Sequence, residues 1–343
     1  MRLDSSHAAP PVEVSKDGRL RPETAGPPAA WALSMVSTAR PTIGIALGGG
    51  AARGWAHIGV LKTLAAAGLE PDIIAGTSIG AVAGACHITG RLKALEDFAC
   101  ALTRRRIFGF LDINFGGSGL ITGQRLNTRL EEHLRDFNIE QLERKFVAVA
   151  TELGTGHEVW LNKGSLVNAL QASFALPGIF RPVQINGRWL IDGALVNPIP
   201  VSVCRALGAR IVIAVNLSND VFSKGAVIHD HEALAETATA GDGAELLGSN
   251  GRAAVHLLHR QIFGRSNGAP GMSAVMMDAI HITQDRIARS RLAGDPPDIS
   301  IAPKLGDFGL FDFHRAYEAI ALGSRAAERQ IDEIKFAVRA LVA

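Results

Sequence analysis

The sequence has few cysteines and little net charge. Its 343 residues include three cysteines, Cys86, Cys100 and Cys204, which have neither metal-site spacing nor the even number of a disulfide framework. This favours a reducing compartment, and we expect a cytoplasmic protein. The formal net charge of +2 is too small to predict nucleic-acid binding, and no arginine-rich stripe with interleaved aromatic residues occurs.

Signals for export and for metal binding are also missing. The N-terminus lacks the basic start and apolar run of a secretory signal. We find no EF-hand loop and no cluster of metal ligands, so we expect neither a metal nor a cofactor. One run, "IIAGTSIGAVAGACHITG" (73–90), contains no charged side chain over a length typical of a membrane span. Because glycines, Thr77 and Ser78 interrupt it, we interpret it as a buried strand, a tight turn and a buried helix.

The chain divides into a leader and one α/β domain. Residues 1–41 hold six of the fifteen prolines and little periodic pattern, which is typical of a disordered leader. We expect a single domain over 42–343, with an insertion or mobile excursion at 219–270. Apolar runs predict strands at 42–47, 72–76, 145–153, 157–161, 188–192, 210–217 and 298–303. Helical patterns occupy 53–67, the segment from about 78, 91–105, 122–135, 165–174, 199–207 and 313 to the C-terminus.

Strands that are apolar throughout and alternate with helices predict a mainly parallel sheet covered on both faces. Within this pattern, "GTSIG" (76–80) stands between a strand and a helix. A strand that turns at once into a helix lifts the turn residue, here Ser78, and leaves no room for a Cβ at Gly76 and Gly80. Such a pentapeptide also arises by chance as a packed turn with an incidental serine.

A glycine cluster, "GGGAARG" (48–54), likewise follows a strand and opens a helix. Its backbone N–H groups suit either a dinucleotide pyrophosphate or the oxyanion of an acyl-transfer reaction. A dinucleotide site needs an acidic residue at the end of the next strand, where this chain has Gly76 and Ser78, so we favour the oxyanion loop. Arg53 would fix this loop, steer an anionic head group or simply be exposed at the helix start. We interpret His57 as a packing residue.

A serine nucleophile needs a base, and Asp192 in "WLIDGALVNPIP" (189–200) is the informative candidate. It ends an apolar strand and is followed by the small residues Gly193 and Ala194, although an Asp-Gly turn has the same pattern. Histidines after it would allow a Ser-Asp-His order. None of them ends a strand or lies among glycines, so a Ser–Asp dyad is simpler; they are His229, His231, His256, His259, His281 and His314.

Together, "GGGAARG", "GTSIG" and "DGA" (192–194) in this order resemble the bacterial patatin-like phospholipase family. The similarity covers about 42–217, is strongest at 172–200 and returns at 307–323. It implies a three-layer α/β/α sandwich, with Ser78 as nucleophile, Asp192 as base and the backbone of Gly49, Gly50 and Ala51 lining the oxyanion hole. Many relatives have glycine where this chain has Ala51. We expect Gly76, Gly80, Arg53 and Gly193 to support the site.

The same resemblance implies hydrolysis of acyl esters of phospholipids, lysophospholipids or simpler lipids. The motifs also fit an acyltransferase, and a non-catalytic lipid-binding protein is a third reading. For contact with a membrane surface, "RRRIFGFLDINF" (104–115) is our candidate. In 271–292, Met272, Met276, Ala279 and Ile280 share one side of a helix. We favour burial of that side against the core, the alternative being an acyl-chain groove or an interface.

Overall fold

The computed structural model describes residues 40–103, 124–220 and 272–342. Nearly all of the predicted leader, the membrane candidate 104–115 and the excursion from residue 221 onward lie outside these ranges. The described strands are β1 (Ile43–Leu47), β2 (Ile73–Thr77), β3 (Lys145–Glu152), β4 (Glu158–Leu161), β5 (Val183–Ile185), β6 (Arg188–Asp192), β7 (Ile211–Val215) and β8 (Ile299–Ile301).

Helices connect these strands, and several are preceded by a short 3-10 turn. The described α-helices are α1 (Ala56–Ala66), α2 (Ile79–Ile88), α3 (Leu92–Cys100), α5 (Gln124–Leu134), α6 (Leu166–Ser173), α7 (Val201–Ala206), α9 (Met272–Gly294), α10 (Ala316–Glu328) and α11 (Ile331–Ala340). The 3-10 turns are η1 (Ala51–Trp55), η2 (Ile139–Gln141), η3 (Gly193–Leu195) and η5 (Phe313–Arg315).

The strands form one sheet in the order β5-β6-β3-β2-β1-β7-β8, with β4 paired to β3 outside this path. Strands β3, β2, β1, β7 and β8 run parallel, whereas β4, β5 and β6 pair antiparallel. The predicted mainly parallel sheet is therefore confirmed. The antiparallel strand β5 was not predicted, because its three residues are too short for a periodic signal.

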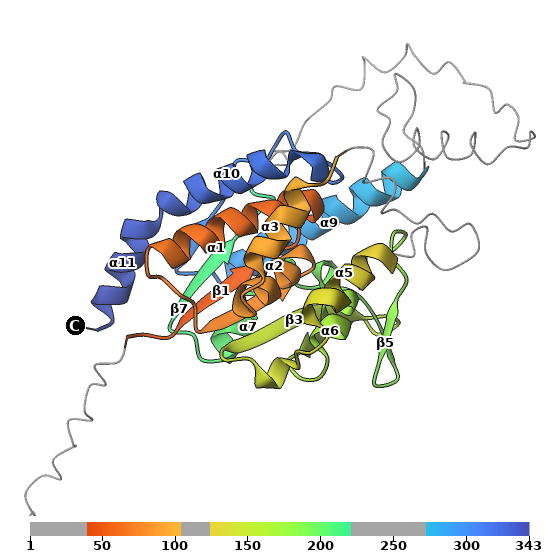
Figure 1. The fold of residues 1–343 in the computed structure, drawn as a ribbon, viewed down its shortest axis with the longest axis horizontal. Helices are drawn as coiled ribbons and strands as arrows, with labels where there is room; N and C mark the ends of the chain where they lie inside the picture. The colour runs from red at the N-terminus through yellow and green to blue at the C-terminus, as the bar shows by residue number, and fades with distance from the viewer. Residues whose placement is uncertain (1–39, 104–123, 221–271, 343) are drawn as a thin grey trace, which may run out of the picture. The chain divides into compact units, whose positions relative to one another are not determined.

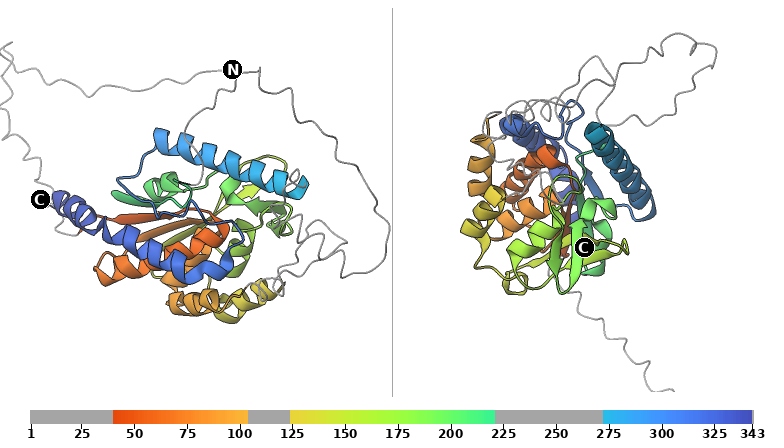
Figure 2. Two further views of the ribbon diagram at one scale, coloured as in Figure 1. Left: turned by 90° about the horizontal axis from the view of Figure 1, so that it is seen from above. Right: turned by 90° about the vertical axis from the view of Figure 1, so that its right-hand side faces the viewer.

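Helices cover both faces of this sheet within residues 40–342 (Figures 1 and 2). Side chains alternate along β1, so Ile43, Ile45 and Leu47 pack into a large core with α1, α2 and α10. Ala46, between them, packs on the opposite face with α7 and α9. The left view of Figure 2 shows α9 and the α1–α10 pair on opposite sides of the sheet. The three-layer α/β/α architecture is confirmed.

Two sequence interpretations can be judged directly against this fold. The uncharged run 73–90 forms β2, a turn at Ser78 and α2, as expected. None of the helices in the described parts of the chain combines the length and the apolar character needed to cross a bilayer. The prediction of one long helix from 313 to the C-terminus was wrong. This segment forms η5, α10 and α11, and Arg329 and Gln330 separate the last two.

Candidate active site

The turn between β2 and α2 holds Ser78 in an unusual conformation, with φ 56° and ψ −125°. A non-glycine residue is strained at such a positive φ, which favours a functional reason for the serine. The predicted need for glycine on both sides is borne out by the backbone. A Cβ on Gly76 would lie 2.4 Å from Ala81 Cα, and one on Gly80 would lie 2.2 Å from Leu47 O.

Sheet register brings the ends of β2 and β6 together. Val149 of β3 pairs with both β2 and β4, and Ala150 pairs with both β4 and β6. Strands β2 and β6 therefore share the edge of β3 that lies opposite β4, and they approach each other head to head. Strand β2 ends with Thr77 opposite Val149, whereas β6 ends with Asp192 opposite Ala150. Ser78 and Asp192, 114 positions apart in sequence, consequently meet at one point of the sheet.

The Ser78 hydroxyl donates a hydrogen bond of 2.6 Å to Oδ2 of Asp192. The other carboxylate oxygen, Oδ1, accepts from Ala194 N–H at 2.8 Å. Asp192 is only 2% exposed, and this burial raises its pKa to about 6, although the bonds from Ser78 and Ala194 act in the opposite direction. The carboxylate is thus poised to exchange a proton near neutral pH.

Backbone contacts fix Asp192 at the end of β6. Its N–H donates to Ala175 O at 3.0 Å, and its carbonyl accepts from the Thr151 hydroxyl at 2.8 Å. The next residue must be small, because a Cβ on Gly193 would lie 2.2 Å from Val149 O. The Asp-Gly pair is therefore explained by close packing of η3 on β3, in addition to the turn chemistry that sequence alone offers.

Ser173 is a further polar residue at this site, and sequence analysis did not single it out. It lies at the end of α6 and is fully buried. Its hydroxyl accepts from Ser78 N–H at 2.9 Å and donates to Val149 O at 2.6 Å. This hydroxyl satisfies the N–H of the strained turn residue and ties it to β3. A serine near a helix end has no sequence pattern that would have revealed this role.

The glycine-rich loop between β1 and η1 runs beside the nucleophile turn. Gly48 N–H donates to Val215 O at 3.2 Å, and Gly49 N–H donates to Pro198 O at 3.0 Å. Both groups are therefore occupied. By contrast, the N–H groups of Gly50 and Ala51 have no acceptor within the described ranges. Ala51 adopts φ 48°, a left-handed conformation that glycine would adopt without strain.

His57 packs against this loop, as we expected from its interpretation as a packing residue. Its ring is fully buried, and Nε2 lies 2.7 Å from Gly48 O. Because a carbonyl oxygen accepts only, Nε2 carries the proton of a neutral ring. Burial lowers the pKa of His57 to about 4, which agrees with that neutral form. The histidine thus orients the loop from outside the reaction site.

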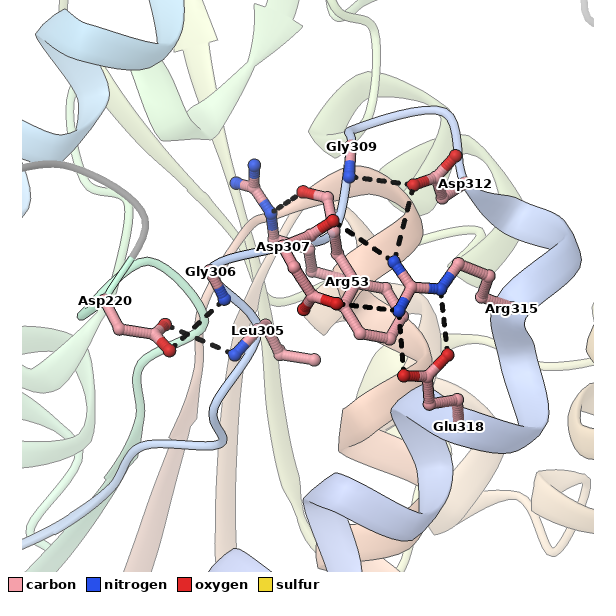
Figure 3. A network of polar contacts seen from close by, with 10 residues as sticks. Arg53, Asp220, Leu305, Gly306, Asp307, Gly309, Asp312, Arg315 and Glu318 are labelled. Carbon is pink, nitrogen blue, oxygen red and sulfur yellow. Dashed lines mark hydrogen bonds and ion pairs between the residues drawn. The ribbon is translucent and has the colours of Figure 1, made fainter.

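Arg53 anchors the same loop to the C-terminal part of the chain (Figure 3). It is 6% exposed, which excludes an exposed helix start, and its Nε donates to Phe308 O at 3.1 Å. The Arg315 guanidinium lies 3.8 Å from the centroid of the Phe308 ring. Nearby, Ala52 N–H donates to Leu310 O at 3.0 Å. These contacts place part of the segment 307–323 directly against the glycine-rich loop.

Ser78 and Asp192 line a cavity of about 1040 Å³. Most of its described walls are apolar, with contributions from α2, α3, α5 and the segment after α6. Val82, Leu95, Phe98, Leu130 and Phe180 are representative. A long apolar cavity that includes a hydroxyl–carboxylate pair fits an extended hydrocarbon chain bearing one reactive polar group.

Helix α9 contributes His281 and Gln284 to this wall, and Asp97 of α3 with Arg129 and His133 of α5 are further polar residues of the lining. The expected buried side of α9 was wrong at two of its four residues: Met276 is 55% exposed and Ala279 is exposed, whereas Met277 and His281 are buried. Ile280 is partly buried and packs against Met277 and Ile179, and the Met272 side chain lies outside what the structure describes. Two helix faces offset by one residue differ by about 100° of rotation. The positions of the methionines in the sequence could not show which face of α9 is buried, since the inward face also carries polar residues.

Five further histidines were candidates for a Ser-Asp-His order. His229, His231, His256 and His259 lie outside the described residues, and His314 lies in η5. Within residues 40–103, 124–220 and 272–342, no group of three or more His, Cys, Asp or Glu side chains is placed to hold a metal ion.

Comparisons with known proteins identify the family. Residues 45–205 match the family model described as patatin-like phospholipase. An uncharacterized NTE family protein of Mycobacterium tuberculosis is 31% identical, over 89% of this chain and 95% of that protein. Lysophospholipase NTE1 of Yarrowia lipolytica is 26% identical, over 85% of this chain and 20% of that protein. Human patatin-like phospholipase domain-containing protein 6 is 33% identical, over 52% of this chain and 13% of that protein. The chain belongs to the patatin-like phospholipase family.

Proposed function

We propose that this protein is a lipid acyl hydrolase that cleaves carboxylic esters through a Ser78–Asp192 dyad. The 2.6 Å hydrogen bond between Ser78 Oγ and Asp192 Oδ2, in the wall of an apolar cavity, is the observation that carries the proposal. Family membership and the name of the yeast relative, a lysophospholipase, support an acyl-ester substrate. The substrates we propose are phospholipids, lysophospholipids or simpler acyl esters.

In the first half of the reaction, Asp192 accepts the proton of Ser78 as Oγ attacks the ester carbonyl carbon. The carbonyl oxygen becomes negative and receives hydrogen bonds from the N–H groups of Gly50 and Ala51. We leave Gly49 out of this donor set because its N–H is bonded to Pro198 O. The carbon–oxygen bond to the alcohol then breaks, and protonated Asp192 returns its proton to the leaving alcohol. An acyl ester on Ser78 remains.

In the second half, water replaces the alcohol. Asp192 accepts a proton from the water molecule as the water oxygen attacks the acyl carbon. The bond between the acyl carbon and Ser78 Oγ then breaks, Asp192 returns the proton to Oγ, and the fatty acid is released. A pKa of about 6 suits both directions, because the carboxylate is largely ionised at pH 7 yet basic enough to take a proton. The N-terminus of α2 behind Ser78 further favours developing negative charge.

The apolar lining explains why a lipid is the proposed substrate. An acyl chain that enters the cavity removes apolar surface of Val82, Leu95 and Phe98 from water, which is favourable by about 25 cal/mol per Å². Apolar walls would offer little to a sugar or a peptide, whose polar groups would lose their hydrogen bonds to water. The fatty acyl part therefore determines most of the binding free energy in this proposal.

The decisive experiment is hydrolysis of a lysophospholipid and of a p-nitrophenyl acyl ester by wild-type protein and Ser78→Ala. We expect turnover by the wild type and a loss of at least about 10³-fold in the variant. Ser300→Ala, which alters an exposed serine of β8, is the matched control and should keep full activity. Full activity of folded Ser78→Ala would refute the proposal.

Product analysis separates this function from the two alternatives. Release of free fatty acid alone across a range of added alcohols and thiols supports hydrolysis, whereas transfer of the acyl group to an acceptor indicates an acyltransferase. Ester binding without turnover, together with no fluorophosphonate label on Ser78, would identify a non-catalytic lipid-binding protein.

A further inference from the structure

His281 and Gln284 are the polar residues that α9 contributes to the cavity containing Ser78 and Asp192. They lie three positions apart, so they neighbour each other on one helix face. His281 is 8% exposed, and Gln284 is partly buried. The family model matches residues 45–205, and both residues lie outside that range.

Neither side chain has a hydrogen-bond partner within the described ranges. The buried Nδ1 of His281 is unpaired, and neither Nε2 of that ring nor the Gln284 amide bonds to a described residue. His57 is an instructive contrast. It is also buried and leaves Nδ1 unpaired, but its Nε2 donates to Gly48 O and fixes the loop. Among the residues that the structure describes, no comparable contact accounts for His281.

A ring nitrogen buried without a partner, as Nδ1 of His281 is, destabilises the folded state, because it loses a hydrogen bond to water and gains none. Each such group in a native structure calls for an explanation. Here the explanation is suggested by position, since the two unpaired side chains lie in the wall of the cavity that contains the dyad. The rest of the described lining is mostly apolar, and its other charged side chains, among them Asp97 and Arg129, come from α3 and α5.

The chemistry of the pair suits an uncharged partner. Burial and the nearby Arg53 charge lower the pKa of His281 to about 4, so its ring is neutral at pH 7. A neutral imidazole offers one donor and one acceptor, and an amide side chain offers both kinds of group. A hydroxyl group, which also donates and accepts, complements both residues.

We infer that His281 and Gln284 bind the alcohol part of the ester substrate through a hydroxyl group adjacent to the scissile bond. The inference rests on the proposed hydrolase function and adds a specificity determinant to it. The acyl chain lies along the apolar walls, and the polyol end of the substrate faces α9. Substrates that the pair favours are acyl esters of a polyol with a free hydroxyl group, such as a glycerol monoester.

The test compares two esters with the same acyl chain, a 1-monoacylglycerol and the corresponding 1-propyl ester, which lacks the hydroxyl groups. The readout is the ratio of their kcat/KM values for the wild type, His281→Phe and Gln284→Leu. We expect the wild type to prefer the glycerol ester and each variant to lower that preference about tenfold, the effect of roughly one hydrogen bond to a buried group. Gln284→Asn, which keeps the amide, should retain part of the preference.

Thr283→Ala is the matched control, because Thr283 lies between the two residues on an exposed part of α9 and its hydroxyl donates to Ala279 O. Its ratio should equal that of the wild type. An unchanged ratio in both His281→Phe and Gln284→Leu, or an equal fall for both esters, would overturn the inference and leave the hydrolase function standing. If His281→Phe does not fold, the partly buried Gln284→Leu decides alone. A wild type that cleaves neither ester but hydrolyses the lysophospholipid also overturns the inference and leaves the hydrolase function standing, whereas one that cleaves none of the three substrates refutes the proposed function itself.

Discussion

Replacing Asp192 by asparagine should abolish catalysis and at the same time stabilise the fold. The carboxylate is buried, and its pKa of about 6 exceeds the ordinary value of 3.8 by about two units. Each unit corresponds to about 1.4 kcal/mol, so ionisation of this one group destabilises the folded state by about 3 kcal/mol at neutral pH. An amide of the same shape avoids that cost. Its oxygen still accepts from Ala194 N–H, and its NH₂ group donates to Ser78 Oγ.

The pH dependence of the stability difference identifies its cause. Because the pKa is higher in the folded chain, the unfolded chain releases this proton first as the pH rises. Wild-type stability therefore falls between about pH 4 and pH 6 through this group and levels off above that range. Asp192→Asn should be more stable than the wild type by up to about 3 kcal/mol at pH 8, and the gain should vanish near pH 4.

Urea unfolding of both proteins at pH 4, 6 and 8, with esterase activity measured on the same samples, tests this reasoning. Groups that titrate alike in both proteins cancel in the difference. A variant less stable than the wild type at pH 8, or a gain that is equal at pH 4 and pH 8, would show that the buried charge is not the source of the effect. Retained activity of Asp192→Asn would remove the carboxylate from the mechanism.

Three further outcomes follow from the same geometry. In pH–rate profiles, kcat/KM for an uncharged ester should fall about tenfold per pH unit below about pH 6, because only ionised Asp192 accepts the Ser78 proton. A kcat/KM that does not change with pH down to about pH 4 would contradict this. Ala51→Gly, at φ 48°, should raise the free energy of unfolding by about 1 kcal/mol and keep activity. A lower free energy of unfolding in this variant would show that the alanine is unstrained. Ser173→Ala leaves Ser78 N–H without its acceptor and Val149 O without its donor, so we expect about 1–3 kcal/mol lower stability in unfolding assays and a lower kcat; wild-type values for both would refute its role in holding the turn.

Local chemistry made several features predictable from the sequence. The strand, turn and helix around Ser78 could be read from small residues at fixed positions, since Gly76 and Gly80 are required by contacts with nearby backbone. The strand that ends at Asp192 was visible as an apolar run with the same final residue. These predictions rested on neighbours in the chain, where steric limits act directly.

Features that depend on distant pairing could not be predicted in this way. The shared edge of β3 that joins β2 to β6 follows from register, which local pattern does not encode. Ser173 meets the turn through tertiary packing alone. The inward face of α9 carries His281, whereas Met276 is exposed. An argument based on burial of apolar residues therefore chose the wrong side of this helix. The cytoplasmic location and the single-domain boundaries stay predictions.

The central claim is that Asp192 activates Ser78 as a nucleophile. Treating the folded protein with a fluorophosphonate and mapping the modified peptide by mass spectrometry tests it directly. We predict that the label is carried by Ser78 in the wild type and that labelling is strongly slowed in Asp192→Asn. Ester hydrolysis that persists while Ser78 stays unmodified, or equally fast labelling in the two proteins, would contradict the account.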